Sequence, residues 1–318
     1  MTSIVSLADL NAPAVDSVLQ GGVISIGNFD GVHRGHALLL REVRRQADKR
    51  GCPAVAVTLF PHPAVLLRPE SAPPRLTWLE RRAERMHALG IDQLIICETT
   101  SELLSLTAES FFELLAIQHM GASGIVEGPN FYFGRDRAGD INTLGELCQR
   151  SGIELSVVTG FRKGHELVSS TRIRDALNRG NVHLACDMLG DAHRIRGRVV
   201  AGDGRGRTLG FPTANLDQID VVVPAPGVYA GWAMIDGGLI RQAAAIHVGQ
   251  SPTFDSGENG KVEVHLLDHN GDLYGHELYV DFVARVRDVA RFESGEQLTQ
   301  QLHQDVDRVR KLLRKSHS

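Results

Sequence analysis

Short apolar runs alternate with helix-forming stretches through the first half of the chain, and this alternation restricts the folds open to it. The apolar runs predict strands at residues 23–26, 54–59, 93–97, 124–126 and 153–158. The stretches between them predict helices near residues 36–49, 77–89, 107–119 and 142–150. Strands that alternate with helices build a doubly wound, mostly parallel sheet, so we predict an α/β fold for this half.

The first predicted strand joins the first predicted helix through the sequence GNFDGVHRGH, residues 27–36. This loop contains three glycines, Gly27, Gly31 and Gly35. Glycines let a backbone approach a ligand closely, and the unpaired N–H groups of a helix N-terminus favour an anion. His33 and His36 lie three residues apart beside that terminus. A phosphate-binding loop and an ordinary turn with two exposed histidines both fit this pattern.

Two further loops follow predicted strands, at residues 61–63 (PHP) and 130–134 (NFYFG). Open parallel sheets bind ligands beyond the carboxyl ends of their strands. We therefore expect both loops to meet residues 27–36 at one rim of the sheet.

Composition limits the classes of protein to consider. The chain has 318 residues, 42% of them hydrophobic, which predicts two globular domains. A formal charge of -4 gives no overall field to attract nucleic acid. Four widely spaced cysteines, no secretory signal and no long apolar run predict a reduced, cytoplasmic protein that does not enter a membrane. The sequence leaves the oligomeric state unknown.

A second polar motif, SSTRIR, occupies residues 169–174 and leads into a helix-forming segment. Ser170 or Thr171 could cap that helix while Arg172 and Arg174 form a solvated face. The alternative is that the two arginines bind phosphate, although a solvated face is the commoner meaning of such a run. The spacing of the motif does not decide between these interpretations.

Beyond Gly190 the pattern changes to strands with hairpin turns between them. Short strands are predicted at residues 197–200, 227–234, 239–248, 262–267 and 277–283. They indicate a small antiparallel barrel, with a domain boundary between residues 187 and 193. Leu298, Leu302, Val306, Val309 and Leu313 form a helical apolar stripe, which we expect to pack on the barrel while the basic residues between them face solvent.

The barrel half contains a glycine-rich segment, GDGRGRTLGFPTAN, at residues 202–215. Its freed backbone amides could form an anion nest, and Thr213 and Asn215 offer neutral oxygens to a hard cation such as Mg²⁺. An ordinary hairpin loop is the alternative. Glu263 lies in a predicted strand, where it could deprotonate a hydroxyl group or simply face solvent.

These motifs together resemble the bacterial bifunctional riboflavin kinase/FMN adenylyltransferases, also called FAD synthetases. The resemblance spans about residues 22–310 and includes, in order, GNFDGVHRGH, SSTRIR, GDGRGRTLGFPTAN, SPTF (251–254), EVHLLD, DLYG and RFES. It implies a Rossmann-like nucleotidyltransferase domain at residues 1–187. It implies a six-stranded antiparallel β-barrel kinase domain with a C-terminal helix at residues 188–318.

The resemblance also implies roles for individual residues of the first domain. His33, His36 and Arg172 would act on the ATP phosphates during adenylyl transfer. The remaining ATP-binding residues would be Gly27, Asn28, Asp30, Gly31, Gly35, Ser169, Ser170 and Thr171. Asn130 would lie beside the flavin.

In the barrel, Glu263 matches the general base of the family, and Thr213 and Asn215 match its Mg²⁺ site. Gly204, Gly206 and Gly210 would bind ATP phosphates, and Arg287 the flavin. The implied reactions are phosphorylation of riboflavin to FMN by ATP, then adenylylation of FMN to FAD with release of pyrophosphate. Mg²⁺ is the implied cofactor, and small molecules are the implied partners.

The same motifs also fit two other functions. One domain could have kept only a regulatory flavin site, or the chain could adenylylate another phosphate-bearing metabolite beside a non-catalytic barrel. Four positions depart from the usual family pattern: Phe60 replaces an acidic residue, Glu127 an apolar one, His247 an asparagine and Ser251 an arginine.

Overall fold

The computed structural model describes residues 2–7, 21–164, 166–202, 204–249 and 261–315. The chain divides into two compact units. The first comprises Met1–Pro74 and Trp78–Ser169, and the second Arg75–Thr77 and Ser170–Ser318. The predicted helix after SSTRIR, α7 (Ser170–Asn178), and the following α8 (Val182–Leu189) belong to the second unit, where α8 contacts the barrel.

The first unit is built on a six-stranded sheet in which every neighbouring pair is parallel, as predicted. The strands are β1 (Ser3–Leu7), β2 (Val23–Ile26), β3 (Ala54–Phe60), β4 (Gln93–Glu98), β5 (Gly124–Glu127) and β6 (Glu154–Val157). Their order is β1-β4-β3-β2-β5-β6, so the winding of the chain reverses between β2 and β5. Sequence analysis missed β1, which pairs with β4 at the edge of the sheet.

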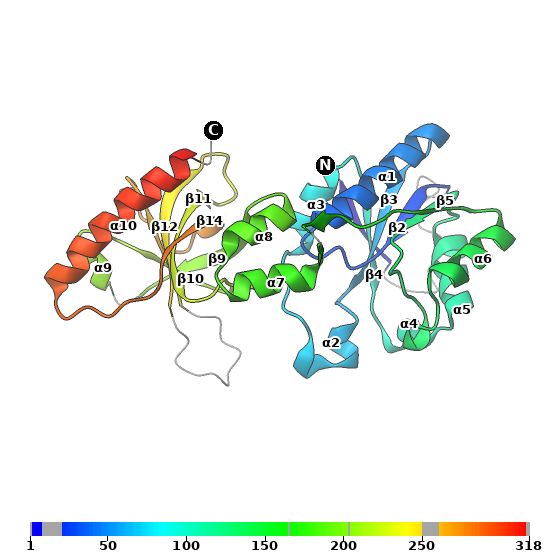
Figure 1. Cartoon of the computed structure of the whole chain (residues 1–318), viewed down its shortest axis with the longest axis horizontal. Coiled ribbons are helices and arrows are strands. Elements are labelled where there is room, and N and C mark those ends of the chain that lie inside the picture. The colour runs from blue at the N-terminus through cyan, green and yellow to red at the C-terminus, as the bar shows by residue number, and fades with distance from the viewer. Residues whose placement is uncertain (1, 8–20, 165, 203, 250–260, 316–318) are drawn as a thin grey trace. The chain divides into compact units, whose positions relative to one another are not determined.

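Helices cover both faces of this sheet (Figure 1). α1 (Arg34–Arg50) and α3 (Leu79–His87) cover one face, and α5 (Ala108–Phe112), the π-helical segment Glu113–His119 and α6 (Ile141–Ser151) cover the other. The short helices α2 (Ala64–Leu67) and α4 (Ser101–Ser105) lie in the segments that follow β3 and β4. Alternate residues of a strand point to opposite faces. Accordingly, Val55 and Val57 pack toward α5 and α6, whereas Ala54 and Ala56 pack toward α1 and α3.

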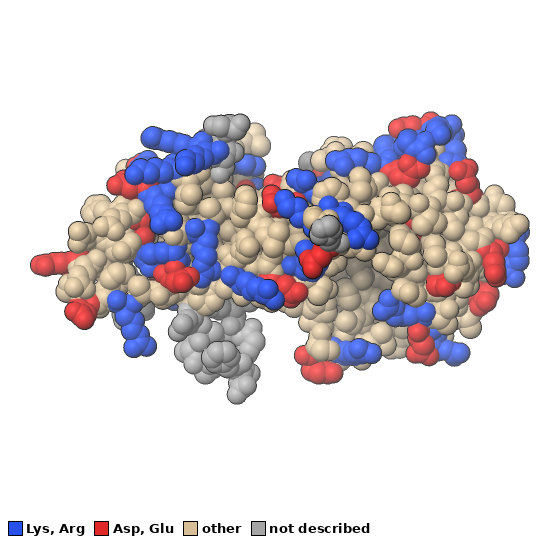
Figure 2. Space-filling model, viewed as in Figure 1, with Lys and Arg blue, Asp and Glu red and all other residues tan. Residues whose placement is uncertain are grey.

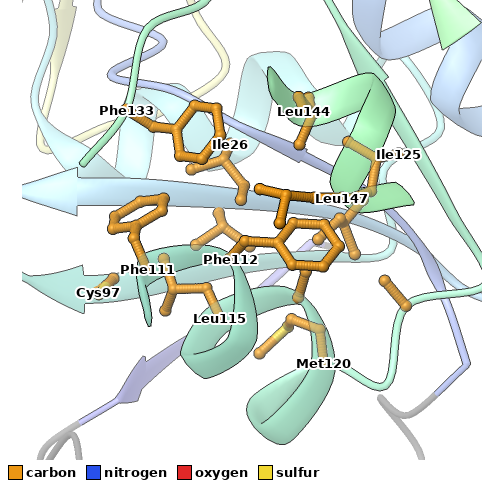
Figure 3. Packing of buried hydrophobic residues seen from close by; sticks show 14 of the residues in the cluster. Ile26, Cys97, Phe111, Phe112, Leu115, Met120, Ile125, Phe133, Leu144 and Leu147 are labelled. Carbon is orange, nitrogen blue, oxygen red and sulfur yellow. The ribbon is translucent and has the colours of Figure 1, made fainter. Parts of the chain in front are cut away.

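Large apolar side chains fill the layer between the sheet and α5 and α6. Figure 3 shows Phe112 beside Leu147 and Phe111 facing Phe133. Leu115 is fully buried there. The predicted amphipathic helix at residues 107–119 therefore provides much of this core, although its second half is π-helical. Thr107 caps its start by accepting a hydrogen bond from the Ser110 amide, at 3.1 Å.

The second unit is a closed barrel of six strands, all antiparallel to their neighbours, as predicted. The strands are β9 (His193–Val200), β10 (Ala214–Asp217), β11 (Gly227–Ile235), β12 (Gln242–Val248), β13 (Val262–Leu266) and β14 (Glu277–Arg287). Their order around the barrel is β10-β13-β12-β11-β14-β9. A single turn of helix, α9 (Arg205–Thr208), lies in the glycine-rich segment.

The C-terminal helix α10 (Gly295–Lys315) packs along the outside of the barrel (Figure 1). Its Val306, Val309 and Leu313 contact the apolar surface of β11 and β14, which confirms the predicted stripe. Lys and Arg side chains gather on the outer surface along the C-terminal part of α10 (Figure 2). Among the described residues, no helix combines the length and apolar character needed to span a membrane.

The core position of Leu115 yields a stability prediction. Leu115→Ala should lower the free energy of unfolding of the first unit by roughly 2–5 kcal/mol, because it leaves a cavity among packed side chains. Thermal or urea unfolding of the whole chain measures this change. Leu67→Ala is the matched control, since Leu67 is 64% exposed on α2 and its loss should change stability little. Equal effects of the two substitutions would contradict the packing described.

Candidate functional site

The loop at residues 27–36 leaves the carboxyl end of β2 and is held to neighbouring elements by hydrogen bonds. The Gly27 amide donates to the Val57 carbonyl at 2.9 Å. The Asn28 carbonyl accepts from Thr58 Oγ1 at 3.2 Å and from Arg82 Nη1 at 3.0 Å. Arg82 also binds Asp30 at 3.2 Å, and both side chains are only 4% exposed. A buried ion pair from α3 thus fixes the middle of the loop.

Two residues of the loop that are not glycine have left-handed backbone conformations. Phe29 has φ 46° and Val32 has φ 40°, which is especially unfavourable for a β-branched residue. Both side chains are 2% exposed in the core against α1, and their burial offsets the strain. Of the three glycines, Gly31 adopts a positive φ, whereas Gly35 provides room, because a Cβ there would come within 3.0 Å of the His33 ring.

His33 and His36 form a compact pair at the start of α1. His33 is the N-cap, and its Nδ1 accepts a hydrogen bond from the His36 amide at 3.2 Å. The neutral His33 ring therefore carries its proton on Nε2. The two rings stack with centroids 3.6 Å apart. His33 is buried and His36 half-buried, so the alternative of two exposed histidines is wrong.

The environment of His36 keeps its imidazole neutral. Burial lowers its pKa well below the usual value, and the nearby His33 and Arg82 lower it further. Its Nδ1 atom is buried and has no hydrogen-bond partner within the described part of the chain. A buried polar atom of this kind is a site for a ligand contact. His36 can therefore meet an anion as a neutral hydrogen-bond donor.

A cavity of about 600 Å³ opens beside this loop. Its walls include Asn28, His62 and Asn130, one from each of the three loops that were predicted to converge. Phe131, Phe133 and Phe111 supply apolar surface. The Asn28 side-chain oxygen is buried and lacks a hydrogen-bond partner among the residues described. This combination of apolar walls and a few polar atoms suits a flat, partly polar ring system.

The SSTRIR motif falls at the division between the two units. Ser169 ends the first unit, whereas Ser170, Thr171 and Arg172 begin α7 in the second. Arg172 is half-buried, and Arg174 is only 9% exposed. The interpretation that both arginines form a solvated helix face is therefore wrong for Arg174.

A second cavity, of about 530 Å³, lies between the outer barrel wall, the glycine-rich segment and α10. A single row of register-paired residues forms one wall. Asn215 lies opposite Glu263, Glu263 opposite His247, His247 opposite Val228 and Val228 opposite Arg287. Directly opposed residues of antiparallel strands share one face, and all five line the cavity. Strand pairing therefore brings together residues that are far apart in the sequence.

Glu263 is a permanently ionised carboxylate in this wall. The side chain of His247, with Nδ1 3.6 Å from Glu263 Oε2, and the Lys261 ammonium, 3.0 Å from Oε1, hold the pKa of Glu263 at about 2. Its side chain is 26% exposed, and that exposure is toward the cavity. Glu263 is thus oriented to accept a hydrogen bond from a ligand hydroxyl group rather than being an ordinary surface residue.

Glycines in the 202–215 segment make room for polar groups at the same cavity. A Cβ at Gly202 would come within 2.1 Å of the Asn215 amide group, and one at Gly206 within 2.4 Å of the Phe211 carbonyl. Asn215 Oδ1 is buried without a hydrogen-bond partner in the described residues, and Thr213 lines the cavity with it. These neutral oxygens suit Mg²⁺, which is bound by oxygen ligands.

Arg287 has a partner that sequence analysis missed. It forms a bidentate ion pair with Asp305 of α10, whose carboxylate is 4% exposed, with its shortest contact at 2.7 Å. The Phe292 ring lies 5.7 Å from the guanidinium group. Arg287 therefore joins α10 to the cavity wall. The SPTF motif, including Ser251, lies outside the described residues.

Glu127, one of the departures from the family pattern, is buried at the end of β5. Burial raises its pKa to about 8 from an ordinary value near 4.5. Between pH 4.5 and 8 the unfolded chain loses a proton that the folded chain keeps, so this group lowers the free energy of unfolding as pH rises.

This linkage yields a prediction. Glu127→Gln should remove a decline in the free energy of unfolding of about 1.4 kcal/mol per pH unit, so the variant's stability advantage should grow from pH 5 to 8. Urea unfolding across that range tests this; a pH-independent difference would contradict it.

Comparison with known proteins shows the family. Residues 15–172 match the FAD synthetase model and residues 189–313 the riboflavin kinase model. Bifunctional riboflavin kinase/FMN adenylyltransferases of Escherichia coli (strain K12) and Pseudomonas fluorescens are each 36% identical, covering 90% and 92% of this chain and 91% and 93% of theirs. A Streptococcus pneumoniae structure described as a macrolide-efflux protein is 32% identical with a TM-score of 0.87, covering 96% of this chain and 98% of its own. The chain therefore belongs to the bifunctional riboflavin kinase/FMN adenylyltransferase family, with an N-terminal FAD synthetase domain and a C-terminal riboflavin kinase domain.

Proposed function

We propose that the cavity beside residues 27–36 performs adenylyl transfer and that the cavity under α10 performs phosphorylation. The observation that carries this assignment concerns buried polar atoms. Among the residues described, each cavity is bordered by such an atom that has no hydrogen-bond partner. In each case the atom belongs to a motif that handles phosphate in the family. These atoms are Asn28 Oδ1 at the first cavity and Asn215 Oδ1 at the second. His36 Nδ1, a third such atom, lies in the same loop as Asn28. No observation favours the alternative in which one domain is only regulatory.

In the phosphorylation step, Glu263 accepts a hydrogen bond from the 5′-hydroxyl group of riboflavin and orients its oxygen toward the γ-phosphorus of ATP. The hydroxyl proton passes to the Glu263 carboxylate as the new O–P bond forms, and the bond between the γ-phosphorus and ADP breaks so that ADP leaves. Thr213 and Asn215 would hold Mg²⁺. When bound, this ion supplies positive charge against the phosphates. Gly204, Gly206 and Gly210 let backbone amides approach the phosphates, and the Arg287–Asp305 pair with Phe292 forms the flavin side of the cavity.

In the adenylyl-transfer step, the FMN phosphate attacks the α-phosphorus of ATP and pyrophosphate leaves. The nucleophile is already an anion, so this step needs no general base. His33, His36 and the N-terminal amides of α1 stabilise the charge that develops on the phosphates. The family motif assigns Ser169, Ser170, Thr171 and Arg172 to triphosphate binding, and Asn130 to the flavin.

The kinase assignment predicts a selective loss. Glu263→Gln should reduce FMN formation from riboflavin by roughly 10²–10⁴-fold, because the amide is a poor proton acceptor, while conversion of FMN to FAD remains. Chromatographic separation of the flavins measures both. Asp307→Asn, an exposed change on α10, is the control and should leave both rates unchanged. Loss of both activities in Glu263→Gln would overturn the two-site assignment.

The adenylyl-transfer assignment predicts the opposite selective loss, in the first unit. His36→Ala should reduce FAD formation from FMN by about 10²-fold or more, through loss of a phosphate contact, and should spare FMN formation from riboflavin. The same flavin separation provides the measurement. His87→Ala, an exposed histidine on α3, is the matched control. Normal FAD formation by His36→Ala would show that residues 27–36 do not carry this reaction.

A further inference from the structure

We propose that Glu127 is a positioning residue for adenylyl transfer. Its carboxyl group accepts the hydrogen bond from the last amide of β2 that a neighbouring strand would otherwise accept. It thereby fixes where the loop at residues 27–36 begins. This inference rests on the proposed assignment of residues 27–36 to that reaction. Glu127 does not line the adenylyl-transfer cavity, so any effect on the reaction would pass through β2.

The pairing of β2 with β5 stops before either strand ends. Val23 pairs with Gly124 and Ile24 with Ile125, and the ladder goes no further. On its other edge β2 stays paired with β3 up to Ile26. Likewise β5 stays paired with β6 up to Glu127. The two central strands therefore separate at their carboxyl ends, where the winding of the sheet reverses.

This separation would leave the Ile26 amide without a backbone acceptor. The amides of Val23 and Gly27 donate toward β3, to Pro53 and Val57. Because amide directions alternate along a strand, the Ile26 amide points toward β5. Glu127 Oε1 accepts this hydrogen bond at 2.6 Å, and the Ser25 hydroxyl also donates to it, at 3.3 Å. The side chain thus bridges the opening between the strands.

The chemical state of Glu127 suits this position. The side chain is only 3% exposed, and burial raises its pKa to about 8, so at neutral pH it is an uncharged acid. An uncharged acid keeps an acceptor oxygen for Ile26 and adds no negative charge near a loop that binds triphosphate. An apolar residue would leave the buried Ile26 amide without an acceptor, which is unfavourable.

The amide that Glu127 holds lies directly before Gly27. From there the chain enters the strained turn at Phe29 and Val32 and reaches the His33–His36 pair. A shift of the last residue of β2 would change the direction in which the loop leaves the sheet. Displacements of about 1 Å in groups that position reactants can cost about 10²-fold in rate.

Two variants separate positioning from mere packing. Glu127→Met fills a similar volume without an acceptor, and Glu127→Gln keeps an acceptor oxygen. We expect Glu127→Met to lower kcat for FAD formation from FMN by roughly 10–100-fold, and Glu127→Gln to stay within about threefold of the unsubstituted chain. FMN formation from riboflavin in the same chains is the internal control and should not change.

Two results would overturn the proposal. One is a normal kcat for FAD formation in Glu127→Met, whether or not its melting temperature is lowered. The other is an equal loss of kcat in both variants. If the first unit of Glu127→Met shows no melting transition, Glu127→Thr is used in its place. The threonine side chain is too short for its hydroxyl oxygen to reach the Ile26 amide. His36→Ala is assayed alongside. Normal FAD formation by His36→Ala would refute the loop assignment, whereas its loss together with normal Glu127→Met would refute only the role of Glu127.

Discussion

The separation of β2 from β5 is the constraint on which the first site depends. Parallel strands with helices on both faces must reverse their winding somewhere, and here the reversal falls between these two central strands. Their carboxyl ends open, the loop at residues 27–36 leaves β2 at that point, and the cavity forms beside it. The opening exposes a backbone amide to the interior, which a regular sheet would have satisfied. Glu127 meets that requirement, and the buried Arg82–Asp30 pair fixes the loop beyond it.

The barrel reaches its site by a different physical route. Strand register, rather than a loop, aligns Asn215, Glu263 and His247 across three neighbouring strands. The apolar face of α10 then covers part of the outer barrel wall and leaves the cavity at the start of the helix. One site thus depends on where two strands separate, and the other on where three strands stay paired.

Periodicity predicted most of the fold, because two-residue and 3.6-residue repeats directly report which faces are buried. The parallel sheet, the barrel and the packing of α10 all followed from it. β1 was missed because its neighbours in the sheet, not its own pattern, make it a strand. Motifs likewise located Glu263, His33 and His36. The partners Arg82 and Asp305 could not be found in this way, since each lies on a separate element and becomes a partner only through tertiary contact. Lys261 lies two residues before Glu263, where strand alternation places both side chains on one face, and it was overlooked.

The central claim is that two separate sites on one chain carry the two reactions, and a mixing experiment tests it most directly. Glu263→Gln chains and His36→Ala chains are incubated, separately and together, with riboflavin, ATP and Mg²⁺, and the flavins are then separated. The account predicts FAD formation slowed by roughly 10²-fold or more in each variant alone, with FMN accumulating in His36→Ala, and a rate in the mixture restored toward that of the unsubstituted chain. FAD formed at the unsubstituted rate by either variant alone, or no gain in the mixture over the single variants, would contradict it.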